Sequence, residues 1–167
     1  MTVDWNRGSG SSALVVARAG SPVDADPLNG TAYTPNSSFG LGTQIGAGNY
    51  VVSNDAGTSL TVSGLSSNTS YYFKVYEYIT PELCYKTPGL TGSAVTLPIT
   101  QASSFTTSNL ASNTMTIGWT RGNGNEVLVV AREGSEVNSD PVNTNLYTSN
   151  TSFGSGSQIG AVNYVVY

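Results

Sequence analysis

The sequence Trp5-Asn6-Arg7-Gly8-Ser9-Gly10 returns as Trp119-Thr120-Arg121-Gly122-Asn123-Gly124, and Leu14-Val15-Val16-Ala17-Arg18 returns as Leu128-Val129-Val130-Ala131-Arg132. Both passages belong to an ungapped internal repeat, in which residues 1–53 align with residues 115–167 at a constant offset of 114, with 32 identities in 53. A period of this length is too long for a solenoid and matches one ordinary domain. The chain of 167 residues therefore holds about one and a half copies of a domain-sized repeat.

The pattern inside one period indicates an all-β fold. Short alternating segments are separated by turn residues, and no stretch has convincing 3.6-residue periodicity. On the longest segment, Tyr71, Phe73 and Val75 fall on one face at period two. The expected strands are residues 2–5, 13–18, 49–53, 60–63, 70–79 and 92–97, and residues 101–107 open the next copy.

A long segment, residues 20–48, interrupts this series of strands. It contains three prolines and six glycines, so we expect a loop. Three side chains are expected to pin this loop to the sheets, and all three are kept in the second copy. They are Tyr33, Phe39 and Ile45, which return as Tyr147, Phe153 and Ile159.

Seven strands with Greek-key spacing and a tryptophan on the second strand predict an immunoglobulin-like sandwich. The passage Leu65-Ser66-Ser67-Asn68-Thr69-Ser70-Tyr71 resembles fibronectin type III domains, which carry a leucine, a threonine four residues on and a tyrosine two further, at the entry to strand F. In that family the tyrosine hydroxyl bonds back to the preceding corner, and Tyr71 matches that role. The sequence departs from the family at Ser67, where proline is usual, at Asn68, where glycine is usual, and in a longer connection between strands C and E.

The joint order of the motifs is similar to the fibronectin type III-like modules arrayed in large secreted and surface proteins of Bacteroidetes bacteria. The resemblance covers nearly the whole chain and implies an extracellular or cell-surface location. With strands named A to G, it makes residues 1–98 a repeat that lacks strand A, and residues 99–167 the first half, strands A to C′, of the next repeat. The chain then carries two B-C-C′ halves and one E-F-G half. We expect other copies of the repeat, in cis or between chains, to complete the second half.

The composition excludes several classes of function. The chain has no histidine, so it lacks an imidazole base or metal ligand. Charged residues make up 10% of the chain, against about 25% in an average soluble protein, and Ser, Thr, Asn and Gly together supply 77 of the 167 residues.

The net charge of -4, with isolated basic residues, argues against nucleic acid as a partner. No apolar run is long enough for membrane insertion, and the single Cys84 forbids an internal disulfide.

Two groups of polar residues are candidate ligand sites. Asp24, Asp26 and Asn29 could present oxygen atoms to Ca²⁺, but the second copy has Asn138, Asp140 and Asn143 there, and ordinary turn chemistry explains these residues equally well. Tyrosines near strand F could form a stacking platform for a glycan. The alternative is that Tyr71 is buried while Tyr72, Tyr76 and Tyr78 are exposed cross-strand packing residues. No pair of acids is placed by a catalytic motif, so we expect neither an enzyme nor a cofactor.

The residues expected to matter are structural. Trp5 and Trp119 mark equivalent core positions, and Tyr71 marks the corner before strand F. Glu77 lies on the core side near the end of strand F, where an unpaired carboxylate is costly. Because strands F and C are antiparallel, this end lies beside the turn that follows strand B, so we predict a charge-assisted hydrogen bond between Glu77 and Arg7.

Two functions remain open from the sequence. The first is a structural repeat of an extracellular stalk, adhesin or filament. The second is a carbohydrate- or ligand-binding accessory module in which residues 20–48 make the site. A binding loop should vary between copies, whereas a structural loop keeps its anchors. The retained anchors favour the structural interpretation, although two copies of one ligand site would look the same.

Overall fold

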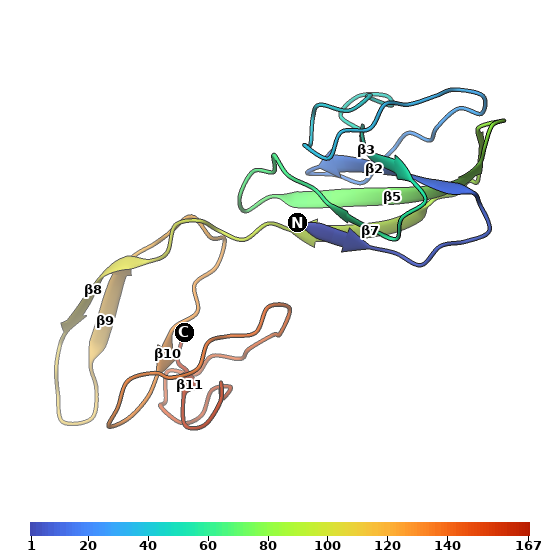
Figure 1. The fold of residues 1–167 in the computed structure, drawn as a ribbon. Coiled ribbons are helices and arrows are strands. Elements are labelled where there is room, and N and C mark those ends of the chain that lie inside the picture. Colours follow the sequence, from blue (N-terminus) through green and yellow to red (C-terminus); the bar gives the residue numbers. More distant parts are fainter. The chain divides into compact units, whose positions relative to one another are not determined.

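The computed structural model describes all of residues 1–167 and is built from eleven β-strands without a helix (Figure 1). All pairs of named strands are antiparallel. The chain divides into two compact units, Met1–Ile99 and Thr100–Tyr167. No helix of the length and apolarity that a membrane crossing needs is present. The all-β class expected from the alternating sequence is confirmed.

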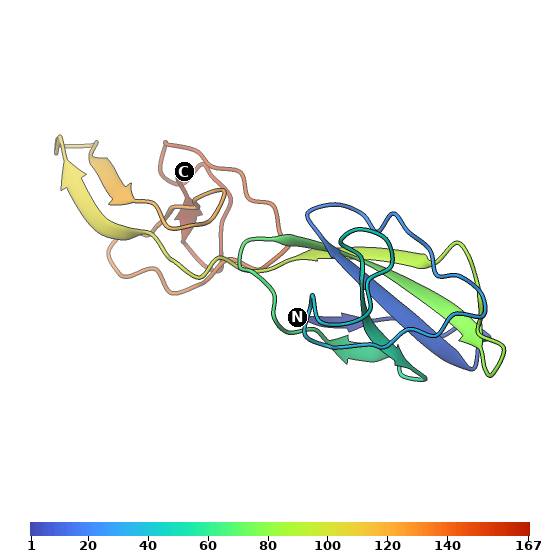
Figure 2. The ribbon, with the colours of Figure 1, turned by 90° about the horizontal axis from the view of Figure 1, so that it is seen from above.

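The first unit contains a five-stranded sheet and a two-stranded sheet (Figures 1 and 2). In the larger sheet, β5 pairs along one edge with β2 and along the other edge with β7 and the short β6, while β3 lies on the far side of β2. The smaller sheet pairs β1 with β4. The strands are β1 (Thr2–Asp4), β2 (Ser12–Ala19), β3 (Tyr50–Asp55), β4 (Ser59–Thr61), β5 (Ser70–Ile79), β6 (Cys84–Tyr85) and β7 (Leu90–Val95).

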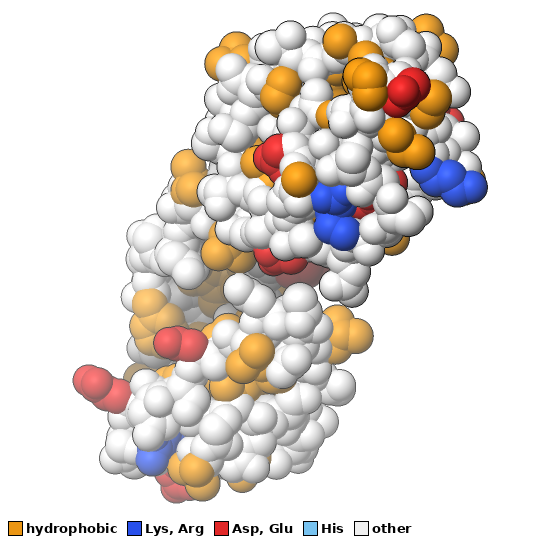
Figure 3. Space-filling view, turned by 45° about the vertical axis from the view of Figure 1, so that its right-hand side comes forward, with side chains coloured by type: hydrophobic (Ala, Val, Ile, Leu, Met, Phe, Trp, Pro, Cys, Tyr) orange, Lys and Arg blue, Asp and Glu red, His pale blue; other side chains and the backbone are white.

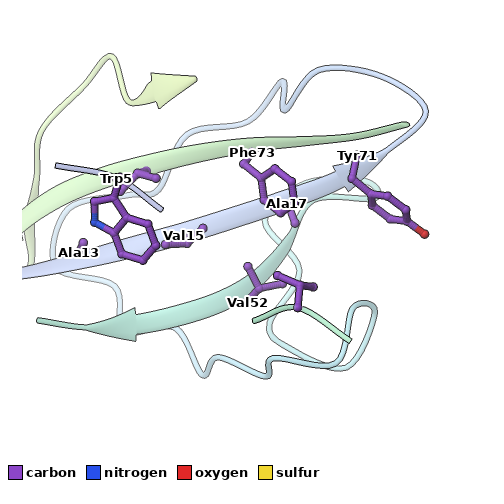
Figure 4. Close-up of a cluster of buried hydrophobic side chains, with 9 residues drawn as sticks. Trp5, Ala13, Val15, Ala17, Val52, Tyr71 and Phe73 are labelled. Atoms are coloured by element: carbon purple, nitrogen blue, oxygen red, sulfur yellow. The ribbon is translucent and has the colours of Figure 1, made fainter. Parts of the chain in front are cut away.

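One apolar core covers the inner face of the larger sheet. Alternate residues of β2 and β5 point to this face, together with Val52 of β3, and Trp5 packs among them just after β1 (Figure 4). Met1, Val3 and Leu60 of the smaller sheet region add partly buried contacts. The cluster consists of Trp5, Ala13, Val15, Ala17, Val52, Val62, Tyr71, Phe73 and Val75. The consistent period-two spacing is what lets one face of each strand enter this core.

A second apolar core covers the opposite face of the same sheet. It joins Leu14, Val16, Val51, Tyr76, Tyr78 and Tyr85 to Val23, Tyr33 and Ile45 of residues 20–48. The long segment therefore acts as a cover over the sheet, held by two of the three anchors expected from the sequence, while Phe39 packs against the first core. Because both faces of β2 are buried, its sequence is a continuous apolar run and not an alternating one.

The expected exposure of tyrosines on β5 is wrong. Tyr76 is 0% exposed and Tyr78 is 5% exposed, while Tyr72 is half-buried. The cover formed by residues 20–48 is the cause, because it removes the outer face of the sheet from solvent. The Tyr76 hydroxyl donates to Asp26 Oδ1 at 2.6 Å, and the Tyr78 hydroxyl donates to Asn54 Oδ1, so both polar ends are satisfied inside the fold.

The second unit contains two separate strand pairs, β8 (Ser103–Ser108) with β9 (Thr116–Thr120) and β10 (Val130–Ala131) with β11 (Tyr164–Val165). The segment that corresponds to the cover keeps its internal structure. Ile45 N donates to Asn49 O at 2.8 Å, and Ile159 N donates to Asn163 O at 2.8 Å. Asn49 and Asn163 are both fully buried. The cover segment therefore forms locally in both copies.

The repeated sequence Leu-Val-Val-Ala-Arg differs in burial and in strand length between the two copies. Leu14 is 0% exposed in β2, whereas the equivalent Leu128 is 37% exposed. The equivalent of the eight-residue β2 is reduced to β10, which has two residues. In the first unit β2 pairs over its whole length with β5, and the second unit has no strand that corresponds to β5. Strand length therefore depends on the partner strand, because the central five residues, Leu-Val-Val-Ala-Arg, are identical in the two copies.

We expect Gly42→Ala to destabilise the first unit. A Cβ at Gly42 would overlap the carbonyl oxygen of Val51, which forces the cover away from β3, and overpacking of this kind costs about 1–3 kcal/mol. Urea unfolding followed by Trp5 fluorescence, in a Trp119→Phe background, measures the effect. Gly156→Ala makes the same overlap with Val165 in the second unit, so it is the matched control and should leave the Trp5 transition unchanged. Equal midpoints for Gly42→Ala and the parent chain would contradict the tight packing of the cover.

Candidate functional site

A carboxylate-binding turn closes one end of the larger sheet in the first unit. Arg7 donates from Nε to Glu77 Oε1 at 2.7 Å and from Nη2 to Glu77 Oε2 at 3.0 Å. The backbone amides of Gly8 and Gly10 donate to the same two oxygens at 3.0 and 3.1 Å. Glu77 thus accepts four charge-assisted hydrogen bonds, two of them from the charged guanidinium, and the pair predicted from the sequence is present in the structure.

Arg7 also connects this turn to a third segment. Its Nη1 donates to the carbonyl oxygen of Ala56, between β3 and β4, at 2.6 Å, and its Nη2 donates to Gly10 O at 2.9 Å. One guanidinium therefore joins the β1–β2 turn, the β3–β4 turn and strand β5. The Arg7 guanidinium and the two glycine amides hold the pKa of Glu77 below its usual range, against the opposing effect of burial.

The glycines of the Arg-Gly-x-Gly turn have a steric role. A Cβ at Gly10 would lie 2.7 Å from Glu77 Oε2 and 2.8 Å from the backbone nitrogen of Tyr78. A side chain at this position would therefore displace the carboxylate or the strand that carries it. Ala13 of β2 pairs directly with Glu77 of β5. This register places the turn before β2 next to the Glu77 carboxylate.

The other predicted structural residues lie in three different settings. Trp5 is buried in the first core, and its indole Nε1 has no hydrogen-bond partner. Trp119, its equivalent, is half-buried and meets Tyr167 edge-on, with ring centroids 5.2 Å apart. Tyr71 is buried, and its hydroxyl accepts a hydrogen bond from Ser66 N at 2.9 Å. Tyr71 therefore fastens the corner that leads into β5.

The residues considered for Ca²⁺ are engaged by groups of the protein. Asp24 pairs with Arg18 and accepts a hydrogen bond from Asn49 Nδ2 at 2.9 Å. Asp26 accepts from the Tyr76 hydroxyl and from Lys74 Nζ at 3.1 Å. These donors lower the pKa of both carboxyl groups. The oxygen atoms fasten the cover to β2 and β5, and no group of three or more acidic or cysteine side chains in the structure could hold a metal ion.

Asn29 and the remaining tyrosines complete the attachment of the cover. Asn29 Oδ1 accepts a hydrogen bond from Tyr85 N at 2.8 Å, and the Tyr85 hydroxyl donates to Thr31 O at 2.9 Å. Burial raises the pKa of Tyr85 to about 12. Tyr78 and Tyr85 pack with ring centroids 5.0 Å apart. Because Tyr76, Tyr78 and Tyr85 are buried, they do not form the exposed platform considered for a glycan.

The surface has a small cleft beside β1 and β7 and few charged side chains. A half-open cleft of about 60 Å³ lies beside β1 and β7 and is lined mainly by Val3, Trp5, Phe73, Val75 and Leu90. Pockets for small molecules are typically about 300–1,000 Å³, so this cleft is small. Charged side chains occupy isolated spots on the face drawn in Figure 3, and uncharged groups cover most of it.

The second unit repeats the carboxylate-binding turn without a carboxylate. Arg121 donates from Nη2 to the carbonyl oxygens of Gly124 and Asn125, at 3.1 and 2.6 Å. Arg7 contacts the Gly10 carbonyl in the corresponding way. Exposed apolar side chains occur in the same unit, among them Met115, Leu128, Phe153 and Tyr167.

Comparisons of the chain with protein-family models, with curated proteins and with solved structures found no match. Each feature of the first copy of the repeat can instead be compared with its equivalent in the second copy. Both copies keep Arg-Gly-x-Gly and the cover, and only the first copy contains β5 and its glutamate.

Parts of the site had no clear signal in the sequence. The bonds from Asp26 to Tyr76 and Lys74 join residues about 50 positions apart, and no motif links them. The short strand β6 was also not expected. One signal was available, because the continuous apolar run of residues 13–17 indicates burial on both faces. That run could have predicted a cover over the sheet.

We expect Glu77→Gln to lower the free energy of unfolding of the first unit by about 2 kcal/mol at pH 7, because a charge-assisted network is lost. The ionised carboxylate stabilises the folded state above its ordinary pKa of 4.5, and this stabilisation disappears as the pH falls through the lowered folded pKa. The difference between the parent chain and Glu77→Gln should therefore shrink below about pH 4.5. Urea unfolding at several pH values measures it.

The repeat supplies a matched control for this experiment. Arg7→Gln should destabilise the first unit, whereas Arg121→Gln changes the same motif where no glutamate is bound and should leave the Trp5 transition unchanged. A difference between the parent chain and Glu77→Gln that stays constant from pH 7 to pH 3 would contradict the role of the carboxylate.

Proposed function

We propose that this chain is a non-catalytic structural repeat of an extracellular or cell-surface bacterial protein, a stalk, adhesin or filament, built from tandem fibronectin type III-like sandwiches. The arrangement of the first unit supports the finer fold. If β1, β2, β3, β4, β5 and β7 are strands B, C, C′, E, F and G, then B pairs with E, and C′-C-F-G form the opposing sheet. This is the strand partition of the fibronectin type III type.

The corner before β5 gives further support to this fold. The Tyr71 hydroxyl bonds to the backbone of Ser66, five residues earlier, as the resemblance implies for the tyrosine that enters strand F. The departures at Ser67 and Asn68 leave this bond in place. The cover, residues 20–48, lies in the connection between strands C and C′ and is an addition to the usual sandwich.

The observation that carries the functional proposal is that the candidate polar and aromatic residues make their contacts inside the fold. Asp24, Asp26 and Asn29 fasten the cover, and Arg7 and Glu77 close the end of the sheet. Side chains that a binding or catalytic module would direct toward a ligand are directed here toward other parts of the domain. A domain tied together in this way suits a load-bearing spacer, and the low charge suits contact with other copies of the repeat.

Force spectroscopy tests this proposal. With handles at Met1 and Tyr167, we expect the first unit to unfold in one event, because β5 is paired on both edges and joins both cores. The released length should be roughly 34 nm, at about 3.4 Å for each of the 99 residues of Met1–Ile99. The second unit should extend at low force without an event of similar size.

Two results would count against the structural role. One is gradual extension of the whole chain without a resolved event. The other is saturable heat of binding when soluble polysaccharides are titrated into the chain, which would favour the ligand-binding alternative. Glu77→Gln serves as the internal check in the force experiment, because a weakened end clamp should lower the unfolding force without changing the released length.

A further inference from the structure

We propose that the second unit contains a binding site for the glutamate-bearing strand, equivalent to β5, of a segment homologous to residues 54–97 that is taken from a further copy of the repeat. The site consists of the Arg121–Gly124 turn and the adjoining residues 127–131. This inference rests on the proposed function, because it names the partner that a tandem structural repeat would receive there. It specifies one residue contact, between Arg121 and the incoming glutamate.

The first unit shows what the incoming strand would do. There, β5 pairs antiparallel with β2, with Ala13 opposite Glu77, Val15 opposite Val75 and Ala17 opposite Phe73. This register puts the glutamate at the turn before β2 and puts Phe73 and Val75 in the first core. Transferred by the offset of 114, the same register places a glutamate opposite Val127, a valine opposite Val129 and a phenylalanine opposite Ala131.

The second unit retains the receiving surface. Leu128-Val129-Val130-Ala131-Arg132 is identical to the corresponding part of β2, but it is paired along one edge only. Val130 and Ala131 pair with β11, and Val129 exchanges backbone hydrogen bonds with Val166 and Tyr167, on the edge that β2 gives to β3. The other edge of this strand, which β2 gives to β5, has no partner strand in the second unit. Unpaired backbone groups beside apolar side chains form a template for an added strand.

The carboxylate-binding turn is also in place before any carboxylate arrives. Arg121 is held by the carbonyl oxygens of Gly124 and Asn125. Thr100 braces the turn, since Thr100 N donates to Asn123 Oδ1 at 2.9 Å and Asn123 N donates to Thr100 O at 3.2 Å. A turn ordered in advance loses less conformational freedom when it binds a partner. The charge of Arg121 makes a carboxylate the matching group.

The occupant is not the β5 strand that the chain already contains. In the first unit β5 is paired on both edges, and Glu77 is bound by Arg7 and two backbone amides. A second copy of this chain has its β5 committed in the same way. The donor is therefore a segment of the repeat whose β5 equivalent has no partner of its own.

The experiment titrates a synthetic peptide with the sequence of residues 54–97 into the full chain under reducing conditions. The amides of residues 127–131 are followed by hydrogen exchange, and Trp119 by fluorescence. We expect saturable protection of residues 127–131 and a shift of the Trp119 emission, with unchanged exchange in β2. A peptide with glutamine at the position of Glu77, or a chain with Arg121→Gln, should bind about tenfold or more weakly. Both changes together should weaken binding no more than either alone.

A peptide with glutamine at the position of Glu82 has the same net charge as the first variant and serves as its control, and it should bind like the parent peptide. If the free peptide is insoluble, the same segment appended after Tyr167 tests the same contact, because Ser53 aligns with Tyr167 in the repeat. Protection that is equal for the glutamate and glutamine forms, or no protection with either the free or the appended segment, overturns the proposal. Neither result affects the unfolding event of the first unit, so the proposed function is tested separately.

Discussion

The pairing of β5 with β2 is the interaction on which the rest of the first unit depends. Through this contact β5 brings Tyr71, Phe73 and Val75 to one core and Tyr76 and Tyr78 to the other. It also carries Glu77 to the turn that holds Arg7. The second unit contains the same turn, the same Leu-Val-Val-Ala-Arg sequence and an equivalent cover, but it lacks β5. There the equivalent of β2 is β10, which has two residues. The long-range partner, and not the local sequence, therefore decides whether this strand is complete.

Most of the strand positions could be predicted from the sequence, because alternation and turn residues are local signals. The six strands expected in the first copy all have counterparts, although residues 92–97 form a strand at Leu90–Val95. The role of residues 20–48 was recognised only in part, because proline and glycine indicate a loop and do not indicate that the loop forms a layer over a sheet. The error at Tyr76 and Tyr78 follows directly, since an alternating strand was assumed to have one exposed face.

The Arg7–Glu77 pair could be predicted because a carboxylate on a core-facing position restricts the possible partners, and the antiparallel order of strands identifies the nearest turn. The hydrogen bonds from the Gly8 and Gly10 amides could not be predicted from the sequence, because they depend on the conformation of the turn. The attachment of Asp26 to Tyr76 depends on the path of the cover and has no signature in the sequence. Local chemistry thus predicted the clamp at the end of the sheet, and three-dimensional packing determined the contacts of the cover.

Hydrogen exchange of the unmodified chain tests the central claim most directly. Residues 14–18 and 128–132 have the same sequence, Leu-Val-Val-Ala-Arg, so their intrinsic exchange rates are nearly equal and a difference in protection reports the presence of a partner strand. We predict strong protection of residues 14–18 and weaker protection of residues 128–132 in a monomeric sample, because the second run is paired along one edge only. Equally strong protection of both runs in the monomer would contradict the claim that β5 completes this strand.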